Sequence, residues 1–151
     1  INDFQENNTA TIQISSSSVG DYEFSLDGIN YQDSNVFSNL NAGDYIVYVQ
    51  DKNGCGIVFE KFYILDYPKY FTPNGDGYND TWFIDNLDKR NLENSIISIF
   101  DRYGKLLKQI NGSGEGWNGT FNETNLPSTD YWFEIKLTNE KIIKGHFSLK
   151  R

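Results

Sequence analysis

Apolar and polar residues alternate along several short stretches of this chain, and the alternation constrains the fold more than any other feature. In residues 130–137, Tyr131, Phe133, Ile135 and Leu137 fall on every second position. A period of two places these side chains on one face of an extended strand, so the pattern predicts a β-strand with one buried face. The same alternation recurs in residues 22–27, 44–50 and 143–149.

Turn-forming residues separate these stretches at short intervals. They are Asp27-Gly28, Asn41-Ala42-Gly43, Asn53-Gly54, Asp101-Arg102-Tyr103-Gly104, Asn111-Gly112 and Asn139-Glu140. Many short strands separated by such turns are typical of β-sandwiches. The weak helical pattern in residues 87–94 predicts one turn at most. The predicted fold class is therefore all-β, built as small Ig-like β-sandwiches.

The distribution of charge divides the chain near residue 67. Residues 1–67 contain two basic and ten acidic residues, whereas residues 68–151 contain eleven of each. The whole formal net charge of −8 therefore lies in the first part. Asp66-Tyr67-Pro68 at the boundary has the composition of a short linker. We expect two small domains in tandem, comprising residues 1–67 and 68–151.

Composition argues against several classes of protein. The isoelectric point near 4.5, without a basic cluster, disfavours nucleic-acid binding. No apolar stretch is long enough to span a bilayer, so we expect no direct membrane insertion. The chain starts at Ile1 without a signal-peptide pattern, and we expect it to be the C-terminal piece of a longer protein, monomeric when isolated. Its single cysteine, Cys55, fits either a small buried residue or half of a bridge to residues outside this chain.

The residues needed for common active sites are missing or badly placed. The single histidine, His146, falls beside Lys144 and Ser148 on the polar face of a predicted strand, where it cannot organise a nucleophilic triad. No His/Cys cluster with zinc-ligand spacing occurs. The glycines of loop 74–80 are followed by Asn and Asp, whose oxygens would repel phosphate. We therefore expect a protein that is not an enzyme.

Calcium is the one ligand for which the sequence offers a site. Calcium is bound by oxygen atoms spaced along a tight loop, at positions 1, 3, 5, 7 and 12 in the EF-hand. The candidate ligands are Asn74, Asp76, the carbonyl of Tyr78, Asp80 and Asp85. The match is imperfect, because the sixth position is Asn79 instead of Gly and the twelfth is Asp instead of Glu. The alternative is a loop of Asx turns, in which Asn74 and Asp76 bond their own backbone. Either way the loop is expected to be structural.

Five blocks in the second half, taken in order, resemble the type B C-terminal sorting domain of the type IX secretion system. This family is also called the gliding motility-associated C-terminal domain of Bacteroidetes. The blocks are residues 71–82 (Phe71-Thr72-Pro73-Asn74-Gly75-Asp76-Gly77 through Trp82), 97–104, 116–119 (Gly116-Trp117-Asn118-Gly119), 126–132 and 145–151. Asp101 and Tyr103 stand where the family usually has Asn and Trp. Residues 1–67 resemble the Ig-like repeats found upstream in large secreted adhesins, without the second Cys that such repeats often carry.

The resemblance implies a function that composition alone does not. The parent protein would leave the periplasm through the type IX translocon and reach the cell surface, with residues 68–151 as the folded address. A PorP/SprF-type outer-membrane β-barrel protein would be the partner. We expect Lys150 and Arg151 to contact that partner.

The last predicted strand also leads to an expectation about topology. The last strand, residues 141–151, is expected to pair with residues 130–137 through Asn139-Glu140 and to bury Ile143, Phe147 and Leu149. We also expect it to lie at a sheet edge, so that Lys150 and Arg151 project from the fold.

The alternative to a sorting signal is a carbohydrate-binding module, in which Trp132 and Tyr103 would stack on sugars.

Overall fold

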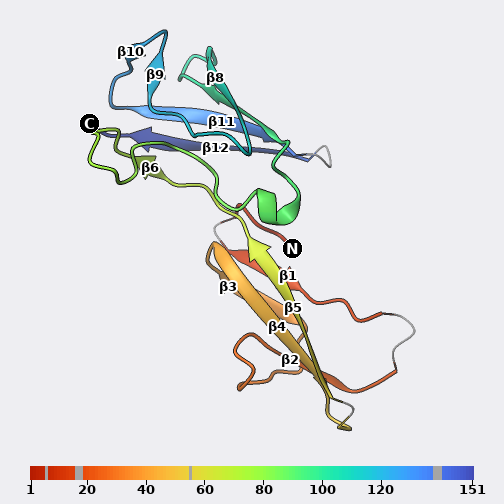
Figure 1. The fold of residues 1–151 in the computed structure, drawn as a ribbon. Coiled ribbons are helices and arrows are strands. Elements are labelled where there is room, and N and C mark those ends of the chain that lie inside the picture. Colours follow the sequence, from red (N-terminus) through yellow and green to blue (C-terminus); the bar gives the residue numbers. More distant parts are fainter. Residues whose placement is uncertain (6, 16–18, 55, 138–140) are drawn as a thin grey trace. The chain divides into compact units, whose positions relative to one another are not determined.

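Strands form nearly all of the regular structure (Figure 1), which confirms the all-β prediction. The computed structural model describes residues 1–5, 7–15, 19–54, 56–137 and 141–151, so Cys55 and the predicted turn at Asn139-Glu140 lie outside the described residues. The chain divides into two compact units, Ile1–Asp66 and Tyr67–Arg151. One 3₁₀ turn, η1 (Asp88–Arg90), falls within the stretch predicted to hold one turn at most. Within the described residues, no helix has the length and apolar character needed to cross a membrane.

The N-terminal unit contains two small antiparallel sheets. One has the order β2-β4-β5, formed by Tyr22–Ser25, Gly43–Asp51 and Ile57–Ile64. The other pairs β1 (Asn8–Thr11) with β3 (Val36–Leu40). Both sheets contribute to one buried cluster, which consists of Phe24, Phe37, Val47 and Val49. The alternation in residues 44–50 therefore buries one face of β4, as the sequence predicts.

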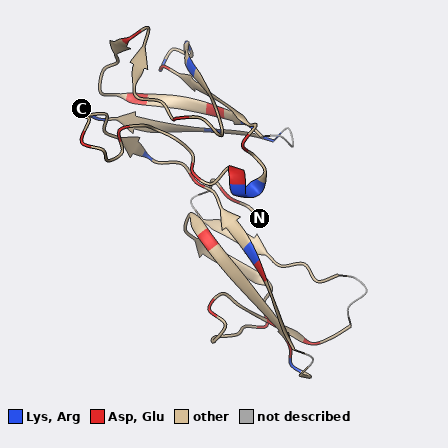
Figure 2. Ribbon diagram, in the orientation of Figure 1, with Lys and Arg blue, Asp and Glu red and all other residues tan. Residues whose placement is uncertain are grey.

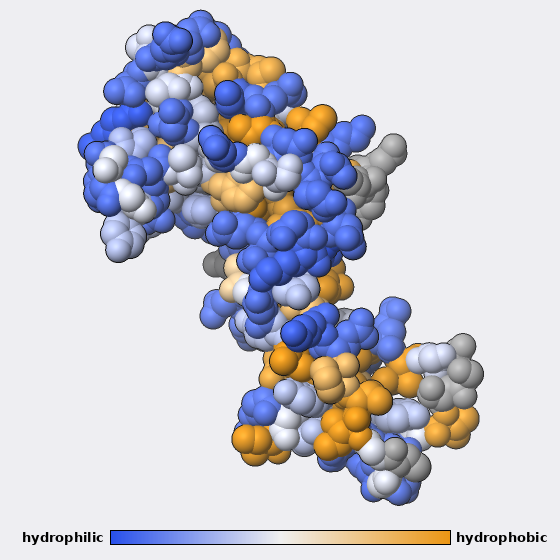
Figure 3. Space-filling view, in the orientation of Figure 1, coloured by the Kyte–Doolittle hydropathy of each residue, from blue (hydrophilic) through white to orange (hydrophobic). Residues whose placement is uncertain are grey.

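Strand β5 lies at the edge of its sheet and exposes apolar side chains on both faces. Val58 and Phe59 are 68% and 67% exposed, and hydrophobic (orange) side chains reach the surface of this unit in Figure 3. Glu60 and Lys61 follow directly, and charged residues in an edge strand oppose pairing with another strand. Figure 2 shows how few basic positions the N-terminal unit carries, in line with its share of the net charge.

The C-terminal unit is built on a five-stranded sheet of order β6-β12-β11-β7-β8. The strands are β6 (Tyr70–Phe71), β7 (Ile96–Phe100), β8 (Leu106–Asn111), β11 (Asp130–Lys136) and β12 (Ile142–Leu149). The predicted pairing of the last strand with residues 130–137 is confirmed, with Tyr131 opposite Phe147 and Ile135 opposite Ile143. The predicted edge position is wrong, because β12 also pairs in parallel with β6 on its other side.

One face of this sheet carries an aromatic core. Phe147, which is 1% exposed, stacks on Trp82 with ring centroids 4.0 Å apart and an interplanar angle of 12°. Trp117 meets Tyr131 edge to face at 5.1 Å. Such pairs add to the stabilisation that comes from burying large apolar rings. The core therefore unites side chains from four of the five sequence blocks that carry the family resemblance.

The layer that covers this core is mostly irregular chain. Trp82 and Trp117 join their segments through an isolated bridge, with N–H to O distances of 2.8 and 2.9 Å in the two directions. Each indole N–H is also satisfied, because Trp82 donates to the carbonyl of Pro68 at 2.8 Å and Trp117 donates to that of Thr120 at 2.9 Å. A short hairpin of β9 (Thr120–Phe121) and β10 (Thr124–Asn125) completes the layer.

Candidate recognition surface of the C-terminal unit

The loop between β6 and Trp82 closes on itself. The Thr72 N–H donates to the carbonyl of Asn79 at 2.7 Å, which brings the two ends of the loop together. Gly75 and Gly77 have φ values of +80° and +88°, a backbone conformation that glycine adopts without steric cost. Asn79, at φ +51°, is of a residue type that tolerates the same region. The glycine spacing of this sequence block thus follows from the backbone of one tight loop.

Asp80 holds the centre of the loop together. Its carboxylate accepts the N–H of Gly75 at 2.6 Å and the N–H of Gly77 at 2.7 Å. These two backbone hydrogen bonds favour the charged form, so they lower the pKa of Asp80 below its ordinary value of 3.8. Two Asx-type contacts complete the loop, because Asn74 accepts from the Asp76 N–H at 3.1 Å and Asp76 accepts from the Tyr78 N–H at 2.8 Å.

The structure groups some of the predicted calcium ligands and separates one of them. Asn74, Asp76 and Asp80 share the loop, and the Tyr78 carbonyl accepts from the Thr72 hydroxyl at 3.4 Å. Asp85 lies beyond Trp82, exposed, before η1. The described residues contain no group of three or more His, Cys, Asp or Glu side chains able to hold a metal ion. The Asx-turn alternative accounts for the contacts seen in the loop, and calcium binding stays a prediction.

The two terminal basic residues differ in their surroundings. Lys150 extends from the end of β12, with its ammonium group 4.5 Å from the centre of the Tyr70 ring. Arg151 is held by the covering layer. Its guanidinium donates to the carbonyl of Leu126, to that of Gly119 at 3.3 Å, and to the side-chain oxygen of Asn125 at 3.2 Å. The expectation of two projecting cations is therefore wrong for Arg151, because it bonds the segment that carries the β9–β10 hairpin.

The backbone at this terminus is also fixed by neighbouring segments. The Lys150 N–H donates to the Phe71 carbonyl at 3.0 Å, and the Leu149 N–H donates to the Thr129 carbonyl at 2.9 Å. The Arg151 N–H donates to the Ser128 hydroxyl at 2.9 Å. Residues from three sequence blocks thus meet at one end of the sheet, joined by the backbone hydrogen bonds of Leu149, Lys150 and Arg151.

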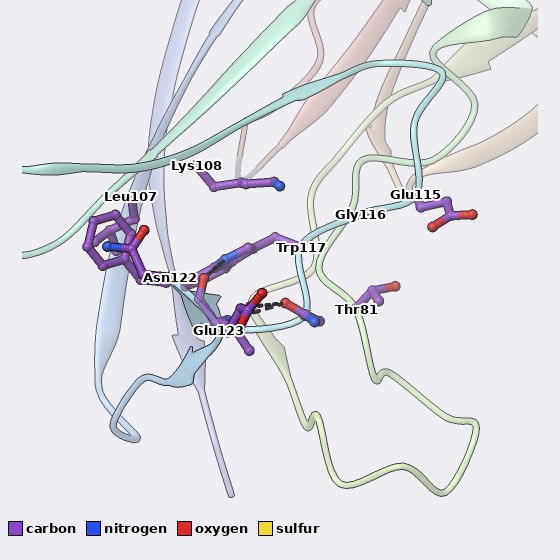
Figure 4. Close-up of a pocket in the computed structure, with 11 residues that line it drawn as sticks. Thr81, Leu107, Lys108, Glu115, Gly116, Trp117, Asn122 and Glu123 are labelled. Carbon is purple, nitrogen blue, oxygen red and sulfur yellow. Dashed lines mark hydrogen bonds between the residues drawn. The ribbon is translucent and has the colours of Figure 1, made fainter.

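A hollow of about 580 Å³ opens between β8 and the covering layer. Figure 4 shows Lys108, Trp117 and Glu123 around it, with Thr81 and Glu115 at one end. Asn122 and Glu123 have φ values of +48° and +63°, as the two central residues of a type I′ hairpin turn require. The single histidine, His146, belongs to β12 and does not line this hollow. The hollow thus offers polar contacts and carries no imidazole base.

The rings singled out as possible sugar contacts lie away from this hollow. Trp132 is 41% exposed and Tyr103 is 84% exposed. Trp82 and Trp117 are buried in the core, so Trp132 is the exposed tryptophan of the chain.

A family model matches residues 65–149, and its description is the CHU_C type IX secretion signal domain. The chain belongs to this family. The matched range covers nearly all of the unit Tyr67–Arg151, which is called the signal domain from here on. The match confirms the resemblance to type IX sorting domains that the five sequence blocks indicate. No curated protein matches the chain.

Two solved structures resemble the chain weakly. The BSP domain of a biofilm-associated protein aligns with a TM-score of 0.38 and 11% identity, over 96% of this chain and 27% of that one. SGBP-B from the mixed-linkage glucan utilization locus of Bacteroides ovatus, solved with a mixed-linkage heptasaccharide, aligns with a TM-score of 0.28 and 10% identity, over 99% of this chain and 42% of that one. The chain spans less than half the length of either protein, and likenesses this weak say nothing of its function.

The sequence did not predict the attachment of Arg151 in the signal domain. Its partners are two backbone carbonyls and an Asn side chain, and carbonyls carry no sequence signal. A small clue was available at Gly119, where φ is +77° and an added Cβ would lie 2.6 Å from a Leu149 methyl group. A glycine with that constraint indicates a close approach of the last strand.

Proposed function

We propose that this chain is the sorting end of a large secreted protein, such as an adhesin, and that its signal domain is a non-catalytic address. The type IX translocon reads the address and delivers the protein to the cell surface. The observation that carries the proposal is the family match over residues 65–149. The residues matched by the family model coincide closely with the compact unit Tyr67–Arg151, which supports the proposal because the sorting signal is then one folded domain.

A folded domain suits an address because its recognition surface exists before the receptor arrives. A preorganised surface avoids the entropic cost of ordering a flexible tail on binding. In the signal domain the sequence blocks of the family build the aromatic core and the loop closed by Asp80. The sequence blocks thus stabilise the fold of the signal domain, and its exposed residues make the contacts with the secretion machinery.

We further propose that a PorP/SprF-type outer-membrane β-barrel protein holds the delivered protein at the surface. The end of the sheet near Lys150 supports this assignment. Lys150 is exposed and lies over the half-exposed ring of Tyr70, and the neighbouring loop presents the exposed ring of Tyr78. Exposed aromatic rings are enriched in protein contacts, and an exposed cation beside them adds electrostatic attraction towards an acidic partner surface. Arg151 contributes by fixing this end of the sheet.

The N-terminal unit is proposed to be an Ig-like repeat of the secreted protein. Its two small sheets around one apolar cluster support this assignment. We propose the domain limits 1–67 and 68–151. The excess of Asp and Glu in residues 1–67 fits a spacer domain, because a net negative charge favours solubility and repels other domains of like charge.

Export of a reporter tests the proposed function. A signal peptide and a fluorescent protein would be fused ahead of residues 1–151 and expressed in a bacterium that has a type IX system. We expect the reporter to reach the surface, and the same fusion in a strain without the translocon to stay in the periplasm. A fusion that ends at Lys141 lacks β12 and should stay inside in both strains. Periplasmic retention of the full fusion in the wild-type host would refute the proposal.

Single substitutions test the contact proposed for Lys150. Lys150→Ala should leave the fold intact and reduce surface retention severalfold, whereas Lys136→Ala, at an exposed position on β11, should not. Equal retention of the two variants would assign the contact to another part of the signal domain.

A further inference from the structure

The face of the five-stranded sheet opposite the aromatic core presents a row of apolar side chains. Strand register aligns them, because Trp132 lies opposite His146 on one side and Phe100 on the other, and Phe100 lies opposite Leu106. The row therefore crosses the neighbouring strands β12, β11, β7 and β8. Trp132 and Leu106 are 41% and 45% exposed. Single exposed apolar residues are common, but Trp132, Phe100 and Leu106 in register form a continuous apolar strip, with the imidazole of His146 at its β12 end.

Polar side chains lie along one side of this row. Glu134 and Lys144 occupy the next register position and form an ion pair at 2.8 Å. Ser98 lies opposite Glu134 on β7 and accepts a hydrogen bond from Gln109 at 3.1 Å. The sheet face thus presents an apolar strip with hydrogen-bonding groups beside it.

Part of this row, without Leu106, lines a hollow of about 620 Å³ at the β7–β8 turn. Phe100, Trp132 and His146 supply its apolar and aromatic lining, and Asp101, Arg102, Glu134 and Lys144 supply its charged groups. A volume of several hundred Å³ is typical of small-ligand sites that combine apolar walls with a few polar groups.

The charges around the hollow decide which class of ligand it suits. Two carboxylates and two cations balance, so the site offers no net attraction to an anion such as phosphate or to a cationic peptide. It suits a ligand that is neutral, has an apolar face to lie on an indole ring, and carries many hydroxyls that both donate and accept hydrogen bonds. A sugar ring has these three properties.

We propose that this hollow binds a neutral oligosaccharide, with one sugar ring lying on Trp132. Glu134 accepts hydrogen bonds from hydroxyls of the neighbouring ring, and Lys144 and Arg102 donate to its oxygens. The site is separate from the sheet end near Lys150, so glycan binding and sorting use different surfaces of the signal domain. An exported protein would then hold a surface or extracellular polysaccharide through the same domain that carried it out.

Tryptophan fluorescence and calorimetry on the full chain test the proposal. The probes are neutral hexasaccharides of glucose (β-1,4 and β-1,3 linked), xylose and mannose. Of the three tryptophans, Trp82 and Trp117 are buried, so a ligand-induced spectral change reports on Trp132. We expect at least one neutral probe to shift the emission and to release or absorb heat. Trp132→Ala should weaken that binding by about tenfold, the scale of one lost stacking contact.

A matched control separates loss of the site from a general effect on the sheet face. Ile142→Ala changes an apolar residue of the same face, 51% exposed, that does not line the hollow, and it should bind as the wild type does. Circular dichroism and melting curves would establish that both variants fold. Trp132→Ala should also be exported normally, since sorting uses another surface.

Several outcomes would overturn the proposal. One is no binding of any neutral probe at millimolar concentration. Another is tighter binding of an anionic hexagalacturonate, or of phosphatidylglycerol vesicles, than of every neutral probe. Loss of export in a folded Trp132→Ala variant would assign the face to the secretion machinery instead. Equal weakening by Trp132→Ala and Ile142→Ala would show a general effect on the sheet face and no binding site at the hollow.

Discussion

Arg151→Ala should destabilise the signal domain measurably, although the side chain is exposed. The guanidinium donates hydrogen bonds to the carbonyls of Leu126 and Gly119 and to Asn125. A hydrogen bond to a charged group contributes about 1.5–3 kcal/mol when shielded from water, and exposure reduces this severalfold. For the three bonds together we expect a loss of about 1–2 kcal/mol. A domain of 60–100 residues loses about 4–8 °C of melting temperature per kcal/mol, so the melting temperature should fall by about 4–16 °C.

Tryptophan fluorescence suits this measurement, because all three tryptophans belong to the signal domain and the N-terminal unit contributes none. Lys150→Ala is the matched control, since its contact with the Tyr70 ring is a solvent-exposed cation–π pair worth about 0.5 kcal/mol. Arg151→Lys keeps the charge but loses the planar fork, and should recover less than half of the stability. Hydrogen exchange at the Leu126 amide, which donates to Gly119, should quicken in Arg151→Ala. An unchanged melting temperature in Arg151→Ala would refute the attachment of this residue.

Three further predictions concern the core and the loop. Phe147→Ala should cost about 3–5 kcal/mol in the free energy of unfolding, measured by urea titration, because it removes a buried ring stacked on Trp82; a cost below about 1 kcal/mol would contradict the packing described. Asp80 has a lowered pKa, so its stabilising effect is complete above its ordinary value of 3.8 and is lost as the pH falls through the lower folded value. The gap in melting temperature between wild type and Asp80→Asn should therefore shrink below about pH 4, and a gap independent of pH would contradict the two backbone bonds. If the loop binds calcium, chelator should lower the melting temperature of the wild type and leave Asp76→Ala unaffected, whereas identical wild-type curves with calcium and with chelator would leave only the Asx-turn loop.

The sequence predicted those features of the fold that depend on local pattern. Alternation at Tyr131 and Phe133 correctly gave the buried face of β11, and alternation at Phe147 gave that of β12. The tight loop before Trp82 followed from its glycines and Asn/Asp residues. Each of these signals lies within a few neighbouring residues, because turn preferences and the alternation of side chains between the two faces of a strand are local properties of the chain.

The order of the strands could not be obtained in the same way. The edge assignment for β12 failed because β6 contributes only two residues, Tyr70 and Phe71, too few to show alternation. The bridge between Trp82 and Trp117 is likewise invisible to a local pattern, since it joins segments far apart in the chain. Side-chain attachments such as that of Arg151 depend on where distant carbonyls lie. Tertiary packing decides these contacts, and a single sequence shows only the residues that permit them.

The central position of β12 has a consequence for how the cell makes this protein. Synthesis runs from the N-terminal to the C-terminal side of the chain, so β12 is the last of the described strands to leave the ribosome. Until β12 is made, β6 has no neighbour in the sheet, and the hydrogen-bonding edge of β11 that pairs with β12 stays open. A chain that ends before Ile142 therefore cannot complete the five-stranded sheet. Under the function proposed above, a translocon that recognises the finished sheet would export proteins translated through to this strand and leave shortened products behind.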